Sequence, residues 1–232
     1  RAFLKDDVRW SVDFSQTDQS RRIPPPPVEK PLPEEARIID LPKLQYLKEI
    51  GHYDLKTAIA ERESCRTYSD EALSIDEIAF LLWSTQGIKL KLDPGHALRT
   101  VPSAGCRHAL ETYLCILNVE GLEKGVYRYL PLEHALLVVA TKIEDFEKKI
   151  VRAALGQPWA GEAAVTFIWT AIPYRMEWRY GLASHKVIAL DAGHVCQNLY
   201  LACEAISAGT CAMAAYNQQE MDNLLGVDGQ DE

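Results

Sequence analysis

The first residues that suggest chemistry form a short cationic cluster, Arg62-Glu63-Ser64-Cys65-Arg66, at the end of a predicted helix. Guanidinium groups four residues apart can converge on one dianion, and the Ser64 hydroxyl provides a further hydrogen-bond donor. Arginines are also common at the ends of solvated surface helices. Taken alone, the cluster is compatible with a phosphate-binding site and with an ordinary exposed helix end.

Two other segments stand out because their side chains are small. Pro102, Ser103, Ala104 and Gly105 follow a long predicted loop, and residues 207–215 follow a long predicted helix. Backbone with so little side-chain bulk can approach a flat ligand closely. The alternatives are an ordinary turn for the first segment and close helix–helix packing for the second.

The elements that would carry these segments are indicated by hydrophobic spacing and by capping residues. Apolar residues recur at helical spacing from 54 to 63. Ser74 and Glu77 have the spacing of a capping box, which starts a helix that Gly87 would end. Further helices are predicted for residues 144–155, 187–208 and 218–225. Residues 89–105, which are rich in Gly, Pro and Ser, are predicted to form a loop.

Several runs of β-branched and aromatic residues predict strands. They cover residues 112–119, 126–130, 135–140 and 166–172. This order of helices and strands indicates an α+β fold, with a central, mainly antiparallel sheet flanked by helices. The sequence shows no internal repeat.

The N-terminal part of the chain has a different composition. Six of the twelve prolines lie between Pro24 and Pro33. Since proline lacks the amide donor that helices and inner strands need, this stretch should run extended over a surface. We therefore divide the chain into an extended arm, residues 1–40, and a folded domain, residues 41–232. The arm could be a linker, a recognition peptide for an aromatic-lined groove, or a strap across a partner subunit.

Composition excludes several classes of protein. The chain has 25 basic and 33 acidic residues, a formal net charge of −8, so we expect no nucleic-acid partner. The six cysteines include no C-x-x-C pair, which predicts no metal site and suits reduced thiols in the cytoplasm. Residues 187–209 are rather apolar but carry Asp191 and Glu204, so we expect a buried helix and no membrane span.

These segments belong to an ordered set of sequence blocks. Four blocks occur in order: Arg62–Tyr68, Leu82–Gly87, Val101–Gly105 leading to Glu111, and Leu190–Leu199. In this combination the chain resembles the nitroreductase-like flavoproteins, and within them the SagB-type dehydrogenases, which include peptide azoline oxidases. The similarity extends from about residue 24 to residue 232. Members of this family usually continue past the Asp-Gly-x-Asp-Glu motif, found here at 228–232, into a strand and a basic phosphate ligand.

The resemblance implies FMN as the cofactor and gives expected roles to three groups of residues. The phosphate and ribityl chain would be held by Arg62, Ser64 and Arg66. The isoalloxazine ring would be lined, from the other subunit, by Pro102, Ser103, Ala104 and Gly105. The ring edge would lie near Ala212, Met213 and Ala214. Because the flavin of such proteins lies between subunits, the resemblance also implies an intertwined homodimer with the 187–208 helix at its interface.

The same resemblance implies a two-step flavin cycle. A reduced nicotinamide, NADH or NADPH, would pass electrons to a small-molecule acceptor such as a nitroaromatic or a quinone. Azoline oxidases of this branch use a Lys-Tyr pair near the position that Arg179-Tyr180 has here. An arginine stays protonated, so it cannot act as the base in place of the lysine. Arg179 could stabilise negative charge and Tyr180 could donate a proton. Two alternatives stay open: an azoline dehydrogenase acting on a modified peptide, and a flavin-binding protein without turnover.

Overall fold

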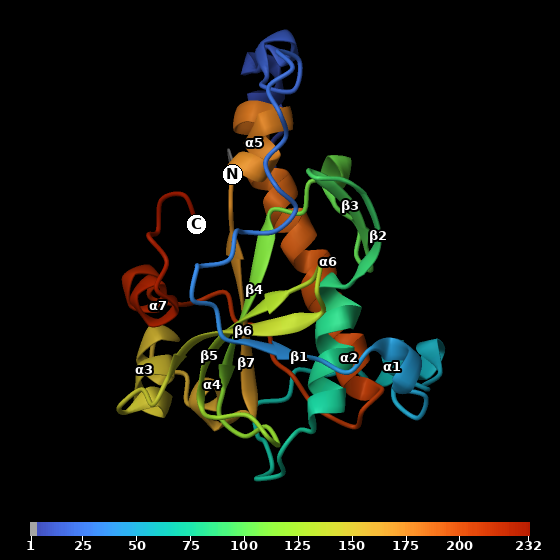
Figure 1. The fold of residues 1–232 in the computed structure, drawn as a ribbon, viewed down its shortest axis with the longest axis vertical. Coiled ribbons are helices and arrows are strands. Elements are labelled where there is room, and N and C mark those ends of the chain that lie inside the picture. Colours follow the sequence, from blue (N-terminus) through green and yellow to red (C-terminus); the bar gives the residue numbers. More distant parts are fainter. Residues whose placement is uncertain (1–3) are drawn as a thin grey trace.

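The computed structural model describes residues 4–232 and has a five-stranded sheet at its centre (Figure 1). The strand order is β1-β6-β5-β4-β7, and every neighbouring pair is antiparallel. The strands are β1 (Ile38–Asp40), β4 (Leu110–Ile116), β5 (Gly125–Leu130), β6 (Ala135–Thr141) and β7 (Val165–Ala171). The predicted α+β fold with a mainly antiparallel sheet is confirmed.

Helices cover both faces of this sheet. On one side lie α2 (Ile75–Gln86) and α6 (Ser184–Glu204), and on the other lie α3 (Phe146–Ala153), α4 (Trp159–Glu162) and α7 (Gln218–Leu225). Two shorter helices, α1 (Leu55–Glu61) and α5 (Tyr174–Tyr180), pack against α6. Short 3-10 helices are η2 (Asp7–Ser11), η3 (Phe14–Gln16), η4 (Leu44–Tyr46), η5 (Ala104–Cys106) and η6 (Gly181–Ala183). Among residues 4–232, no helix combines the length and the apolar character needed to cross a bilayer.

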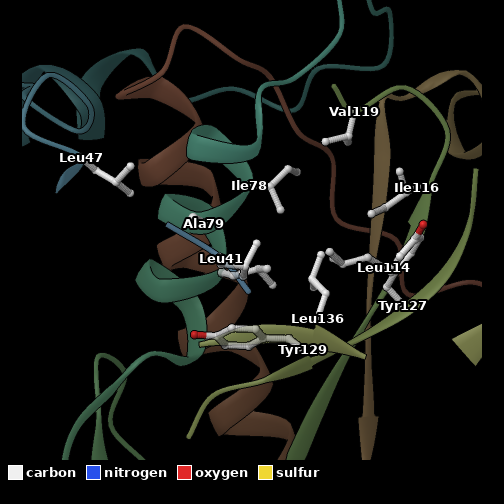
Figure 2. Packing of buried hydrophobic residues seen from close by; sticks show 11 residues of the cluster. Leu41, Leu47, Ile78, Ala79, Leu114, Ile116, Val119, Tyr127, Tyr129 and Leu136 are labelled. Atoms are coloured by element: carbon white, nitrogen blue, oxygen red, sulfur yellow. The ribbon is translucent and has the colours of Figure 1, made fainter. Parts of the chain in front are cut away.

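The side chains of β4 show why the sheet is covered on both faces. Leu114 and Ile116 point into the cluster shown in Figure 2, where Ile78 of α2 packs on the sheet. Tyr113 and Cys115, which alternate with them, belong to a second cluster with α3 and α7. Because neighbouring residues of a strand face opposite sides, a strand buried along its whole length needs a helical layer on each side.

Local capping chemistry fixes the ends of α2 as the sequence predicts. The Glu77 amide donates to the Ser74 hydroxyl oxygen at 3.2 Å, and the Ser74 amide donates to the Glu77 carboxylate at 2.7 Å. Gly87 is the residue that follows the last turn. The short helix predicted over 218–225 is also confirmed, as α7.

Some predicted elements are wrong or missing. The predicted loop over 89–105 contains a β-hairpin, β2 (Ile88–Asp93) paired with β3 (His96–Arg99). Ile88, Leu90 and Leu92 alternate with lysines and so carry a strand pattern, which the Gly and Pro residues around it obscured. The helices α4 and α5 were not predicted, and α6 begins at residue 184 in place of 187.

The proline-rich segment lies across its own chain and is held by buried guanidinium groups. Arg99 donates to the Val28 carbonyl at 2.7 Å, and Arg128 donates to the carbonyls of Lys30 and Pro31 at 3.1 and 3.2 Å. Proline offers only a carbonyl to the hydrogen-bonding network, so donors must come from the body of the protein. The division of the chain at residue 40 stays a prediction, and β1 shows that residues 38–40 already pair with the sheet.

Candidate functional site

The cationic cluster lies where the end of α1 meets the segment that follows α6. Arg62 is the residue directly after α1, and its side chain is half-buried, whereas Ser64 and Arg66 are exposed. Ser64 pairs with Thr210 in a parallel bridge, and the Cys65 amide donates to the Thr210 carbonyl at 3.0 Å. The structure therefore brings two of the predicted segments side by side, although Ser64 and Thr210 lie 146 positions apart in the sequence.

Gly209 explains why small residues are needed at this junction. A Cβ atom at Gly209 would lie 2.6 Å from the Cβ of Cys65, which is too close for two carbon atoms that are not bonded to each other. A larger residue would push the two backbones apart. The small-residue run after α6 thus permits the close approach of the backbone that follows α1, a contact that the sequence did not predict.

The residues predicted to lie near a ring edge follow this junction. Ala212 and Ala214 are exposed, while Met213 between them packs into the cluster formed with α3 and α7. The Met213 side chain therefore anchors the segment, and the alanines on either side of it stay exposed. Ala212 and Met213 also line a cavity of about 770 Å³ that runs along β7.

This cavity has the size and the mostly apolar lining of a small-molecule pocket. Its walls come from β7, α6, α7 and the Thr210–Ala212 segment, and they include Trp159 and Trp169. The guanidinium of Arg66 lies 5.7 Å from the centre of the Trp159 ring, so Arg66 stands beside one wall. In the described part of the chain, the indole N–H groups of both tryptophans are buried without an acceptor.

One tyrosine that sequence reasoning missed connects the two segments. The Tyr200 hydroxyl oxygen lies 3.0 Å from the Ser64 hydroxyl oxygen and accepts a hydrogen bond from the Ala212 amide at 2.8 Å. The Arg62 guanidinium lies 5.3 Å from the centre of the Tyr200 ring, within the range of a cation–π contact. No local pattern around Tyr200 marks it, because its partners come from other parts of the chain.

The second predicted segment, Pro102–Gly105, forms a tight loop against α5 and α6. The Ser103 hydroxyl accepts from the His108 amide at 2.8 Å, and the Ala104 amide donates to Asp191 of α6 at 3.4 Å. Gly105 has a φ of 60°, in the left-handed region that glycine tolerates best. Burial raises the pKa of Asp191, and its second carboxylate oxygen has no hydrogen-bond partner among residues 4–232.

The predicted catalytic pair lies directly over this loop. A Cβ atom at Gly105 would lie 2.7 Å from both the Cδ of Arg179 and the hydroxyl oxygen of Tyr180. Arg179 and Tyr180 close α5, with the Arg179 guanidinium 5.6 Å from the Tyr180 ring. The structure thus brings the predicted ring-lining loop together with the predicted catalytic residues.

The two halves of the predicted site do not meet within one chain. The Pro102–Gly105 loop contacts α6 at Asp191, and the cationic cluster contacts α6 at Tyr200. Nine residues of helix correspond to about 14 Å along its axis. The face of α6 near the loop includes exposed residues, among them Leu190, which is 58% exposed, and His194.

The charge of the cluster is not balanced locally. Within the described part of the chain, neither Arg62 nor Arg66 forms an ion pair with a carboxylate, although the whole chain carries a net charge of −8. Two uncompensated guanidinium groups and a hydroxyl are the donor set that phosphate groups favour. The cluster therefore presents the kind of donors that a phosphorylated ligand requires.

Comparisons with known proteins agree with this geometry. Residues 59–232 match the Nitroreductase family. A protein of Methanocaldococcus jannaschii assigned as a nitroreductase is 29% identical over 189 residues, which cover 82% of this chain and 89% of that protein. The microcin B17-processing protein McbC of Escherichia coli is 27% identical over 142 residues, 59% of this chain, and the match spans only 51% of McbC.

Solved structures support the fold. Crystal structures assigned as nitroreductases from Ralstonia eutropha and Anabaena variabilis both superimpose with a TM-score of 0.68 at 24% identity. The match covers 90% of this chain and 92% of the Ralstonia protein, and 84% of this chain and 39% of the Anabaena protein. The resemblance seen in the sequence is confirmed.

Proposed function

Because the chain belongs to the nitroreductase family and is an oxidoreductase, we propose that it binds FMN and passes electrons from a reduced nicotinamide to an organic acceptor. The acceptor would be a nitroaromatic, a quinone or a similar compound. The observation that carries the proposal is the pair Arg62 and Arg66, which have no carboxylate partner among residues 4–232. Arg66 lies beside Trp159 in the wall of the cavity.

The residues present fit an FMN molecule at both ends. Arg62, Ser64 and Arg66 supply charged and neutral donors for the phosphate. Ala212 and Ala214 are exposed, and since the Ala212 amide donates to Tyr200, it is the Ala214 amide and carbonyl that would face the edge of a flat ring. When bound, the flavin supplies the hydride and electron transfer, and the protein supplies position and electrostatics.

The roles we propose for Arg179 and Tyr180 follow from their charge and position. A guanidinium group has only hydrogen-bond donors and no acceptor, so we propose that Arg179 stabilises negative charge and does not act as a base. Tyr180 offers a hydroxyl proton beside the Gly105 backbone. Both residues lie against the loop that would line the ring, so they would be close to any charge on it.

We propose that the functional unit is a homodimer in which the Pro102–Gly105 loop of a second copy completes the site. The separation of the two clusters along α6 supports this arrangement, since one chain alone does not bring them together. Exposed apolar side chains at the start of α6 and just before it support it further: Leu182 is 62% exposed and Leu190 is 58% exposed. A second copy that packs on this part of α6 would cover both leucines.

A second candidate function is azoline oxidation on a modified peptide. It is favoured by the similarity to McbC, whose name describes microcin B17 processing, although the match spans about half of that protein. It is disfavoured by Arg179, which cannot take up the proton that a lysine could remove. Oxidation of a peptide azoline by the purified protein, without nicotinamide, would select this alternative.

The test is an absorption spectrum of the purified protein, followed by anaerobic titration with NADH and NADPH. We expect oxidised-flavin bands that bleach on titration and return when a quinone or a nitroaromatic is added. The double variant Arg62→Gln/Arg66→Gln should be colourless. The control variant Arg37→Gln should stay yellow, because Arg37 is an exposed arginine just before β1. A wild-type preparation that stays colourless after addition of FMN contradicts the proposal, and a yellow protein that no nicotinamide reduces supports a flavin-binding protein without turnover.

A further inference from the structure

Tyr200 occupies a buried position between the two ends of the proposed FMN site. It lies on α6, is 8% exposed, and makes polar contacts with Ser64 on one side and Ala212 on the other. Ser64 belongs to the group expected to hold the phosphate, and Ala212 to the segment expected near the ring. One hydroxyl therefore joins both parts of the site.

The direction of these hydrogen bonds follows from the number of protons available. An amide N–H only donates, so the Tyr200 oxygen is the acceptor in the 2.8 Å contact with Ala212. The phenol has a single proton, and the Ser64 oxygen, 3.0 Å away, is an acceptor within reach. When Tyr200 donates to Ser64, the proton of Ser64 is left free for another acceptor.

We propose that Tyr200 is a positioning residue that makes Ser64 a hydrogen-bond donor to the FMN phosphate. The chain of donors runs from the Ala212 amide through the Tyr200 hydroxyl to the Ser64 hydroxyl, and each bond polarises the next. This inference rests on the proposed function, because it needs a phosphate at Ser64. Arg62, whose guanidinium lies over the Tyr200 ring, is held at the same place.

A Tyr200→Phe change separates this role from simple packing. Phenylalanine keeps the ring that lies under Arg62, but it lacks the hydroxyl. Ser64 would then lose the proton donor that fixes its orientation, and the effect should fall on the phosphate end. Tyr127→Phe is the matched control, because the Tyr127 hydroxyl donates to the Glu123 carbonyl at 2.7 Å in the core between α2 and the sheet.

The experiment compares the affinities of FMN and riboflavin, measured by quenching of flavin fluorescence. Riboflavin lacks the phosphate, so the dissociation constant of riboflavin divided by that of FMN reports the contribution of the phosphate alone. We expect Tyr200→Phe to lower this ratio about fivefold to twentyfold, in the range of one or two hydrogen bonds. Ser64→Ala should lower it to a similar degree, and the double variant should lower it no further. Tyr127→Phe should leave it unchanged.

The outcomes separate the inference from the proposed function. If wild type prefers FMN and Tyr200→Phe weakens FMN and riboflavin equally, Tyr200 only supports the fold and the inference is overturned. It is also overturned if the effects of Tyr200→Phe and Ser64→Ala on the ratio add up in the double variant. A wild-type chain that binds neither flavin, or binds both equally, contradicts the proposed FMN site itself and this inference with it.

Discussion

The buried ion pair between Glu111 and Arg175 gives the sharpest test of the fold. The Arg175 guanidinium donates to the Glu111 carboxylate at 2.5 Å, and both side chains are 2% exposed. The same carboxylate oxygen accepts from the Lys30 amide at 3.1 Å, so the pair also holds the proline-rich segment. Removing one member of such a pair leaves a buried charge without a partner, which typically costs about 3–5 kcal/mol.

We therefore expect Glu111→Leu and Arg175→Met each to lower the free energy of unfolding by about 3–5 kcal/mol. Because a domain is stable by only about 5–15 kcal/mol in total, each variant should unfold at much lower urea concentration. The double variant should cost less than either single change, since an apolar pair of similar volume has no charge to leave unpaired. Its residual cost of about 1–2 kcal/mol reflects the Lys30 amide, which loses its acceptor.

The assay is urea denaturation at low temperature, followed by circular dichroism and by tryptophan fluorescence. The four proteins, wild type, two single variants and the double variant, form a double-mutant cycle that isolates the pair. Single variants that cost less than about 1 kcal/mol would show that water reaches the pair. Costs that simply add in the double variant would refute the reasoning.

The remaining predictions concern pH, backbone strain and capping. Burial raises the pKa of Glu29 to about 7, so the free energy of unfolding should fall as pH rises from about 4.5 through 7. The Glu29→Gln variant should not show this loss. At pH 8 it should be about 1–2 kcal/mol more stable than wild type, a value reduced to allow for the partial exposure of Glu29. Equal stability of the two proteins at pH 8 would contradict this. Gly105→Ala should cost about 1–3 kcal/mol in thermal unfolding, because its φ is 60° and the new methyl group would meet Arg179 and Tyr180; an unchanged melting temperature would mean that the loop can move aside. Ser74→Ala should cost about 1 kcal/mol in urea denaturation through loss of the α2 capping box, and a cost below about 0.3 kcal/mol would argue against it.

The sequence by itself determined the helices whose ends are fixed by residues a few positions away in the chain. The capping box at Ser74 and the residues 218–225 each place a helix through contacts three or four positions apart, so spacing alone predicts them. The cationic cluster and the small-residue segments could be found in the same way. Family resemblance then suggested roles for them, because several blocks occur in a fixed order.

Only the tertiary structure decided which of these segments meet. Tyr200 touches Ser64 across 136 positions, and Arg175 reaches Glu111 across 64, and no local pattern encodes either contact. The sequence predicts that the proline-rich segment runs extended over a surface, but it does not say which residues hold it there. In the structure, buried arginines far along the chain donate to its carbonyls. Such contacts depend on the path of the whole chain, because the local sequence around each residue does not specify which distant residue it will meet.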